Sequence, residues 1–151
     1  MTRLSWREPV WFARPAHRLP FIAALTAAAV GPRCVRAPRP YRGGFALRCT
    51  ITPPGIGACT VTIVFGKGSP EVPRVFVDGP TDSPHRYVDG SLCMWYPYDP
   101  PERRWQRSDG PVVLLGHIAA HLIREHWWRR TGEWAGDEAA HRTQTPQQET
   151  R

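Results

Sequence analysis

The stretch from Phe45 to Phe65 reads Phe-Ala-Leu-Arg-Cys-Thr-Ile-Thr-Pro-Pro-Gly-Ile-Gly-Ala-Cys-Thr-Val-Thr-Ile-Val-Phe, and it decides the fold. Apolar and polar residues alternate over residues 45–52 and again over 59–65, a pattern typical of β-strands with one buried face. The Pro- and Gly-rich residues 53–57 between them predict a turn. A third strand is expected over residues 74–77, after a second turn at 66–70. Three short strands joined by tight turns predict an antiparallel β-meander.

One helix is predicted before this meander in the sequence and another after it. The first is an Ala-rich helix over Leu19–Val30, with Pro20 in its first turn and a Gly-Pro pair at its end. The second follows a loop at residues 98–110 that is rich in Pro, Asp and Arg. The sequence therefore predicts an α+β fold with an N-terminal helix, an antiparallel β-meander, an active-site loop and a C-terminal helix.

The second helix has recognisable ends. Ser108 or Asp109 is the expected cap, Pro111 lies in the first turn, and Gly132 follows the last turn near Arg130. Its inward-facing positions recur at helical spacing and are predicted to be Leu115, Ile118 or Ala119, Leu122 and His126.

Length and composition indicate one soluble domain. The chain has 151 residues, of which 41% are hydrophobic, enough for a single core. We expect an Arg/Trp-rich segment at 1–18, the domain at 19–136 and a polar flexible tail at 137–151. The apolar run at 21–30 is too short to cross a bilayer and begins too late for a signal peptide. The expected location is therefore the cytoplasm, with no membrane contact.

The formal net charge is +7, but its distribution does not indicate a nucleic-acid-binding protein. Every basic residue except Lys67 is an arginine, a bias that a GC-rich genome also produces. The arginines are scattered along the chain, apart from one group formed by Arg33, Arg36, Arg39 and Arg42.

The four cysteines do not form a zinc or disulfide pattern, because no pair is spaced Cys-x-x-Cys. Neither a metal nor another cofactor is expected. Cys49 and Cys59 lie on the apolar faces of their strands and are predicted to be buried structural thiols. Cys34 lies in an Arg/Pro-rich linker that indicates no role for it.

Cys93 differs from the other three because it follows a Gly-Ser turn and precedes an aromatic-proline segment. A working thiol needs partial exposure, polar neighbours and a rigid backbone, so Cys93 is the predicted catalytic residue. His85 is expected to fold back close to the thiol or to brace its loop. Tyr87 is a candidate hydrogen-bond donor, and Asp89, with Asp99, a candidate to orient or deprotonate an incoming amine.

Two groups on the second helix have other interpretations. His117, His121 and Glu125 are one turn apart and have the spacing of a metal site, but no glutamate directly follows the first histidine. Ordinary helix packing is the prediction for them. The tryptophans at 127, 128 and 134 are predicted to pack around the helix end, with part of that surface suited to a protein partner.

The order of elements and the residues around Cys93 resemble the ubiquitin-conjugating-enzyme family. Its members carry a His-Pro-Asn motif and then Gly-x-Ile/Leu-Cys, whose cysteine holds ubiquitin as a thioester. Residues 90–93 match the second motif. His85 keeps the histidine of the first, whereas Arg86 and Tyr87 stand in place of its Pro and Asn. In the eukaryotic enzymes this Asn is credited with supporting the loop and the oxyanion.

The chain is more similar to the divergent prokaryotic branch of that family, over residues 40–141. The pattern of that branch is His-x-Tyr-x-Asp-Gly-x-Leu-Cys, then Tyr and Pro, a Trp, a helix, and Trp with Thr-Gly-x-Trp-x-Gly and His. The matching positions are His85, Tyr87, Asp89, Gly90, Leu92, Cys93, Tyr96, Pro97, Trp105, Trp127 or Trp128, Thr131, Gly132, Trp134, Gly136 and His141.

This branch is associated with bacterial antiphage operons, notably those of cyclic-oligonucleotide signalling (CBASS). The resemblance implies a cysteine acyltransferase in antiphage defence. Cys93 would accept the C-terminus of a ubiquitin-like protein or of a CBASS nucleotidyltransferase as a thioester and pass it to an amine or a thiol. An activating enzyme is a further implied partner. Two alternatives stay open: a catalytically inactive, protein-binding adaptor of the same fold, and a cysteine hydrolase.

Overall fold

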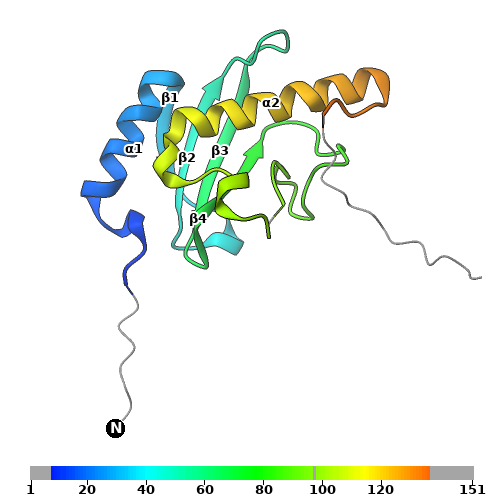
Figure 1. Ribbon diagram of the computed structural model, residues 1–151. Coiled ribbons are helices and arrows are strands. Elements are labelled where there is room, and N and C mark those ends of the chain that lie inside the picture. Colours follow the sequence, from blue (N-terminus) through cyan, green and yellow to red (C-terminus); the bar gives the residue numbers. More distant parts are fainter. Residues whose placement is uncertain (1–7, 97, 137–151) are drawn as a thin grey trace, which may run out of the picture.

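The computed structural model describes residues 8–96 and 98–136 and has an α+β architecture built on one antiparallel sheet (Figure 1). The sheet has four strands in the order β1-β2-β3-β4. In chain order the elements are the 3-10 helix η1 (Trp11–Ala13), α1 (Pro15–Ala28), β1 (Val30–Val35), the 3-10 helix η2 (Arg39–Tyr41), β2 (Phe45–Ile51), β3 (Cys59–Gly66), β4 (Ser69–Val77), the 3-10 helices η3 (Pro101–Arg103) and η4 (Arg107–Asp109), and α2 (Gly110–Thr131). The predicted order of helix, meander, loop and helix is confirmed.

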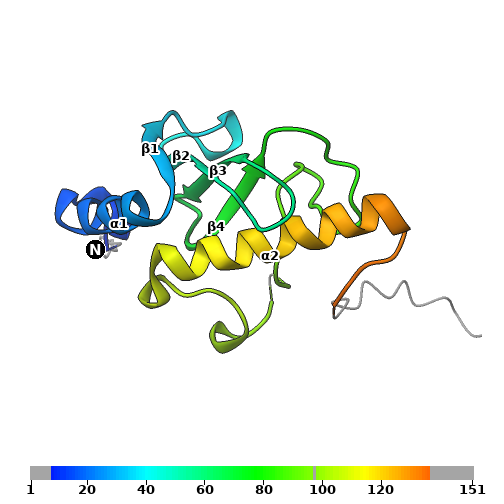
Figure 2. The same ribbon diagram turned by 90° about the horizontal axis from the view of Figure 1, so that it is seen from above.

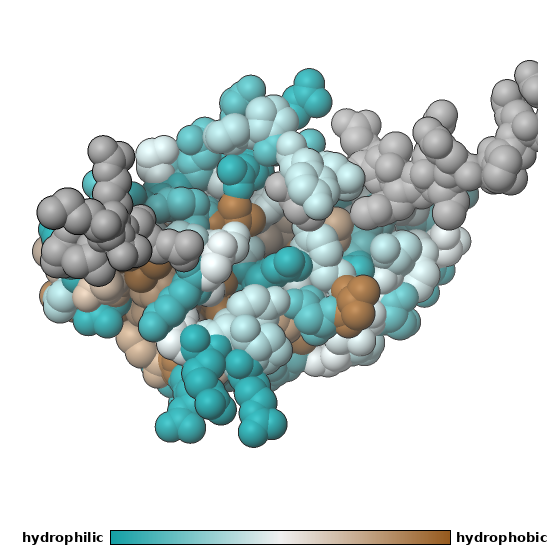
Figure 3. Space-filling view, turned by 90° about the horizontal axis from the view of Figure 1, so that it is seen from below, coloured by the Kyte–Doolittle hydropathy of each residue, from teal (hydrophilic) through white to brown (hydrophobic). Residues whose placement is uncertain are grey.

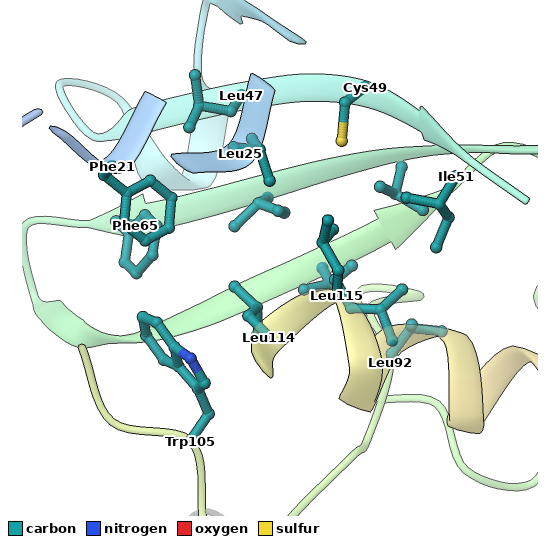
Figure 4. Close-up of a cluster of buried hydrophobic side chains, with 14 of the residues drawn as sticks. Phe21, Leu25, Leu47, Cys49, Ile51, Phe65, Leu92, Trp105, Leu114 and Leu115 are labelled. Carbon is teal, nitrogen blue, oxygen red and sulfur yellow. The ribbon is translucent and has the colours of Figure 1, made fainter. Parts of the chain in front are cut away.

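The main core lies between the sheet and the two helices. Helix α2 crosses in front of the strands, and α1 packs beside its first turns (Figure 1). The close-up in Figure 4 shows side chains from both helices meeting the strands and the loop tryptophan Trp105. Leu25, Leu47 and Leu114 are fully buried there. Burial of this apolar surface is the main stabilising contribution to the fold.

The opposite face of the sheet is also partly covered, which differs from the single buried face expected of β2 and β3. The connection between β1 and β2 lies on the other side of the sheet from α2 (Figure 2). Ala46 and Val64 are buried beneath it together with Ala37, and Tyr41 packs against this group. The central strands are therefore apolar on both faces where this connection crosses them.

Helix α1 begins and ends earlier than predicted, at Pro15 and Ala28 instead of Leu19 and Val30. Pro15 takes the first-turn position, where a missing N–H costs nothing, and Pro20 lies inside the helix. Pro20 cannot donate to the carbonyl of Ala16. Both residues are exposed, so water can satisfy that carbonyl and the helix continues.

Two strands were missed or shortened in the prediction. The residues of β1 were predicted to form the end of a helix and a linker, because Gly31-Pro32 is a poor strand sequence. The structure accommodates these two residues in the strand through a register irregularity between Val30 and Arg33. Cys34 therefore lies on this edge strand, where it is exposed. β4 begins at Ser69, not Arg74, because its prolines fall on an edge strand that needs fewer backbone donors.

The core extends to residues before 19. Trp11 and Phe12 are buried in it, and Trp11 Nε1 donates to the carbonyl of Pro70 at 2.6 Å. The Trp11 ring also packs edge-on against Phe65, with centroids 5.0 Å apart. Part of the Arg/Trp-rich segment thus belongs to the packed unit. The expected tail at 137–151 lies outside the described residues.

Helix α2 ends as predicted at Gly132, which adopts a left-handed conformation with φ 77°. Its start differs, because Asp109 makes no side-chain cap to α2 and instead accepts the backbone N–H of Gln106, the residue before η4. Across residues 8–96 and 98–136, no helix has both the length and the apolar character needed to cross a membrane.

Candidate functional site

Residues 85–93 form a tight antiparallel turn that brings His85 opposite Cys93. The backbone N–H of Cys93 donates to the carbonyl of His85 at 2.9 Å, and that of Tyr87 donates to Ser91 at 2.9 Å. Arg86 and Leu92 pair between them. The backbones of His85 and Cys93 are therefore held side by side across this turn.

The turn is also anchored to the fold. Leu92 is buried in the main core, and its N–H donates to the carbonyl of Val75 at 2.9 Å. This fixes the backbone immediately before Cys93. Gly90 makes the reversal possible because its φ is +86°, a conformation that other residues rarely adopt.

The Cys93 thiol is more buried than the sequence predicted, with 9% of the residue exposed. Its Sγ lies 3.9 Å from the carbonyl oxygen of Trp95, and the Tyr87 hydroxyl donates to the same carbonyl at 2.9 Å. Burial raises the pKa of the Cys93 thiol, while the nearby Tyr87 hydroxyl, if it turns toward the sulfur, and the positive charge of Arg74 oppose part of that rise. The thiol is therefore mostly protonated near neutral pH, with two groups placed to stabilise its thiolate.

Arg74 is a site residue that sequence reasoning missed. It lies on β4, and its guanidinium carbon is 4.3 Å from the centre of the Tyr87 ring, a cation–π contact. Its charge also favours the ionised forms of Cys93 and Asp89. Nothing in the local sequence points to this role, since a half-buried arginine on an edge strand is ordinary.

The Tyr87 hydroxyl keeps its proton and acts as a hydrogen-bond donor. Burial, followed by the charge of the nearby Cys93 thiolate, raises the pKa of Tyr87 far above its ordinary value. The hydroxyl consequently keeps its proton throughout the physiological pH range. The hydroxyl donates to the carbonyl of Trp95, and a role for Tyr87 in catalysis stays a prediction.

Asp89 holds the turn together. Its Oδ1 accepts the backbone N–H of Ser91 at 2.9 Å and the Ser91 hydroxyl at 2.6 Å, and its Oδ2 accepts the Tyr41 hydroxyl at 2.5 Å. Burial alone would raise the pKa of Asp89, but the hydrogen bonds from Ser91 and Tyr41 outweigh it and lower that pKa. Asp99 similarly accepts the backbone N–H of Tyr96 at 3.1 Å. Both carboxylates are thus engaged by their own loops.

A buried ion pair ties the turn to α2. Arg86 donates to the two carboxylate oxygens of Glu125 at 2.5 and 2.8 Å, and to the carbonyl of Gly90 at 2.8 Å. Glu125 is 1% exposed. Burial opposes its ionisation, yet the hydrogen bonds from Arg86 and the His121 ring, whose Nε2 lies 3.4 Å from Oε1, lower the pKa of Glu125 to about 2. The prediction that His126 faces inward is wrong: His126 is exposed, and Glu125 takes the buried position because Arg86 compensates its charge.

Trp134 connects this ion pair to His85. After Gly132 turns the chain, the Trp134 ring lies 4.1 Å from the His85 ring and 5.2 Å from the His121 ring, measured between centroids. His85 is 7% exposed beneath it. This tryptophan packs at the helix end as predicted, whereas Trp127 is half exposed.

The histidines of α2 are not arranged around a common metal. His117 packs edge-on against Trp95 at 5.7 Å, while His121 faces Glu125 and Trp134. Among the residues that the structure describes, no three His, Cys, Asp or Glu side chains are grouped closely enough to hold an ion. Cys49 is buried in the core, and burial raises its pKa, as expected of a structural thiol; Cys59 is half buried.

The chain matches a known protein family over most of its length. A family model described as E2-CBASS, Type II CBASS E2 protein, matches residues 33–142. No curated protein and no solved structure matches the chain. The matched region is well over half of the chain and contains the whole turn from His85 to Cys93, its partner Glu125 and Trp134. The chain therefore belongs to the Type II CBASS E2 family.

Proposed function

We propose that this protein is a ubiquitin-conjugating-like acyltransferase that carries an acyl group as a thioester on Cys93. Family membership supports an E2-like role in a CBASS system. The proposed donor is the C-terminus of the CBASS nucleotidyltransferase or of a ubiquitin-like protein, activated where needed by a separate enzyme. The proposed architecture is that of the ubiquitin-conjugating enzymes.

The observation that carries the proposal is the clamped turn around Cys93. Leu92 and the Cys93 N–H fix the backbone of the nucleophile, while Tyr87 and Arg74 favour its thiolate. A nucleophile fixed relative to its activating groups is what thioester chemistry requires. Among the described residues, the other three cysteines lie on strands β1, β2 and β3 and not on such a turn.

The reaction has two steps. The Cys93 thiolate attacks the activated carbonyl carbon, a C–S bond forms, and the donor's leaving group, an AMP or a thiol, departs. An acceptor amine then attacks the thioester carbonyl, a C–N bond forms, and the C–S bond breaks to return the thiolate. We assign to His85, whose backbone is bonded to that of Cys93, the removal of the proton that the amine loses.

Tyr87 stands where the eukaryotic enzymes carry an asparagine. Its protonated hydroxyl donates to the carbonyl of Trp95, which the Cys93 sulfur also approaches. We assign to it the support of the loop and of the negative charge that develops on sulfur or on the carbonyl oxygen. Loss of one such donor in other enzymes costs about 10²- to 10³-fold in rate.

The limited access to Cys93 suits a carrier better than a hydrolase. The residue is only 9% exposed, which restricts the approach of bulk water to a thioester carbonyl at this position. A protein that must hold its acyl group until the correct acceptor arrives needs such protection.

The test is adduct formation with the nucleotidyltransferase or ubiquitin-like protein of the same operon, together with the activating enzyme and ATP. We expect a higher-mass species that dithiothreitol removes and that Cys93→Ala does not form. Cys93→Ser should form an oxyester that dithiothreitol leaves intact but hydroxide cleaves. Cys34→Ser, which removes the exposed thiol, serves as the matched control and should retain the adduct.

Two results would reject the proposal. An adduct that persists in Cys93→Ala, or none with the cognate partner, excludes Cys93 as the carrier. Full antiphage activity of Cys93→Ser without any adduct would instead favour the inactive adaptor. A burst of product from a simple ester, with rapid turnover by water, would favour the hydrolase.

A further inference from the structure

A group of positive charges lies on the connection between β1 and β2. The face in Figure 3 is mostly hydrophilic, with strongly hydrophilic side chains projecting from it and only small hydrophobic patches. Between β1 and β2, Arg36, Arg39 and Arg42 line one pocket of about 600 Å³ with Ala37 and Gly43. Lys67 adds a fourth cation, because its Cε lies 2.8 Å from where a Cβ on Gly43 would be.

These cations have no carboxylate partner within the part of the chain that the structure describes. Elsewhere in those residues, Arg48, Arg86, Arg107 and Arg129 each pair with an Asp or Glu. Arg36, Arg39 and Arg42 are exposed and take part in none of these pairs. Like charges held close together repel, so an anionic ligand would be attracted to this pocket.

The pocket is built on a rigid segment. Tyr41, between two of the arginines, packs against Phe76 with ring centroids 6.2 Å apart, and its carbonyl accepts the N–H of Gly44 at 2.8 Å. Prolines 38 and 40 restrict the backbone on either side of Arg39. The guanidinium groups are therefore presented from a fixed frame, which lowers the entropic cost of binding.

The same segment is bonded to the Cys93 turn. The Tyr41 hydroxyl donates to Asp89, and Asp89 accepts from Ser91, which lies two residues before the thiol. The pocket and the thiol thus belong to one hydrogen-bonded unit. A chain bound at the pocket would be anchored next to the turn where its reactive end must be placed.

We infer that this pocket binds an acidic, carboxylate-rich segment of the protein partner in acyl transfer; the inference rests on the function proposed above. Guanidinium forks match carboxylates in bidentate geometry. Small-ligand sites bury most of their ligand. These three arginines are exposed, which suits acidic side chains of a chain lying across the surface.

The test measures binding of a tetramethylrhodamine-labelled hexaglutamate peptide by fluorescence anisotropy, using the full chain as Cys93→Ala so that no transfer occurs. The pocket variant is R39E/R42E. The matched control is R103E/R130E, which changes the net charge equally at two exposed arginines that no described ion pair includes. We expect at least about 10-fold weaker binding in the pocket variant, under about 2-fold in the control, and weaker binding in high salt.

Three results would overturn the inference: no binding to the parent protein, an equal loss in both variants, or displacement of the peptide by inorganic triphosphate well below the concentration at which unlabelled hexaglutamate competes. The last would identify a phosphate site. The result of this binding test does not depend on the carrier role of Cys93, because the peptide is bound by a variant that lacks the thiol. A dithiothreitol-sensitive adduct in the parent protein supports the carrier role whether or not the peptide binds.

Discussion

The sheet–helix core and the Cys93 turn lie against each other but are held together by different forces. The core is a continuous set of apolar side chains from α1, α2 and the strands, with Leu25 and Leu114 fully buried. The turn contributes only Leu92 from residues 85–92 to that core. Otherwise it depends on polar contacts: Arg86 with Glu125, Asp89 with Ser91 and Tyr41, and Tyr87 with Trp95.

The difference separates stability from chemistry. Apolar burial is non-directional and tolerates small adjustments, whereas charge-assisted hydrogen bonds fix orientation and register. A turn that must hold a thiol relative to a donor and a partner histidine gains from directional contacts. Substitutions in the two regions should therefore change different properties of the protein.

The largest effect is expected where the two regions meet, at Glu125. Glu125→Ala leaves the guanidinium of Arg86 buried without its carboxylate, which costs about 3–5 kcal/mol of unfolding free energy. Urea unfolding should show this loss, together with slower adduct formation at Cys93 in the remaining folded protein. Arg129→Ala is the control: Arg129 also contacts Glu125 at 3.3 Å but is partly exposed, so under about 1 kcal/mol should be lost.

The double variant Arg86→Met, Glu125→Leu sharpens this result, because it removes both buried charges together. We expect it to recover most of the stability while adduct formation stays slow. If the double variant did not recover stability, the ion pair would not be what connects the turn to α2. Equal losses in Glu125→Ala and Arg129→Ala would lead to the same conclusion.

The same carboxylate makes stability depend on pH. The pKa of Glu125 is lowered from 4.5 to about 2 on folding, so the unfolded chain binds a proton first as the solution is acidified. Its contribution is complete above about pH 4.5 and falls as the pH drops toward 2, by about 3 kcal/mol in all. In Glu125→Ala, unfolding free energy should be flatter over this window. An unchanged slope would contradict the assignment.

The core could be predicted from the sequence far better than the turn. Alternation over residues 45–65 depends only on neighbouring residues, and it located β2 and β3 and the inward direction of Leu47 and Ile63. β1 was missed because Gly31-Pro32 hides a strand that exists only through pairing with β2. The predicted strands were therefore correct where the pattern depended only on neighbouring residues.

The contacts around Cys93 depend on residues far away in the chain. The bond between Arg86 and Glu125 spans 39 positions, and the one between Tyr41 and Asp89 spans 48. Local sequence cannot indicate that Arg74 lies beside Tyr87 or that Trp134 lies on His85. The cysteine itself stood out because the strands accounted for Cys49 and Cys59, whereas its surroundings required the fold.

A core substitution should show the opposite behaviour to Glu125→Ala. Leu114→Ala removes a fully buried side chain and leaves a cavity, at a cost of about 3 kcal/mol. Adduct formation per folded molecule should stay close to that of the parent, because no polar contact of the turn changes. Val113→Ala, at a position that is 45% exposed on the same helix, is the matched control and should cost under about 0.5 kcal/mol. Loss of adduct formation in folded Leu114→Ala would mean that the two regions are not separable.

The smallest effect on stability, and the most specific effect on the thiol, is expected for Tyr87→Phe. The change removes the hydroxyl that lowers the pKa of Cys93, so that pKa should rise further above its ordinary value. A hydrogen bond of about 1 kcal/mol corresponds to about 5-fold less thiolate at a fixed pH below the pKa. Iodoacetamide labelling of Cys93, followed by peptide mass spectrometry in a Cys34→Ser background, should slow by that factor at pH 8. The midpoint of the plot of labelling rate against pH should move to higher pH.

Tyr96→Phe provides the comparison for that measurement, because the Tyr96 side chain is 41% exposed on the same loop. Its labelling profile should match that of the parent. A Tyr87→Phe profile that is unchanged, or that moves to lower pH, would remove Tyr87 from the chemistry and leave it as a support for the Trp95 carbonyl. The predicted pattern, in which thiolate formation changes while urea unfolding shifts by no more than about 1 kcal/mol, is the reverse of that for Leu114→Ala. Together the two variants decide whether the turn carries a chemical role that the core does not share.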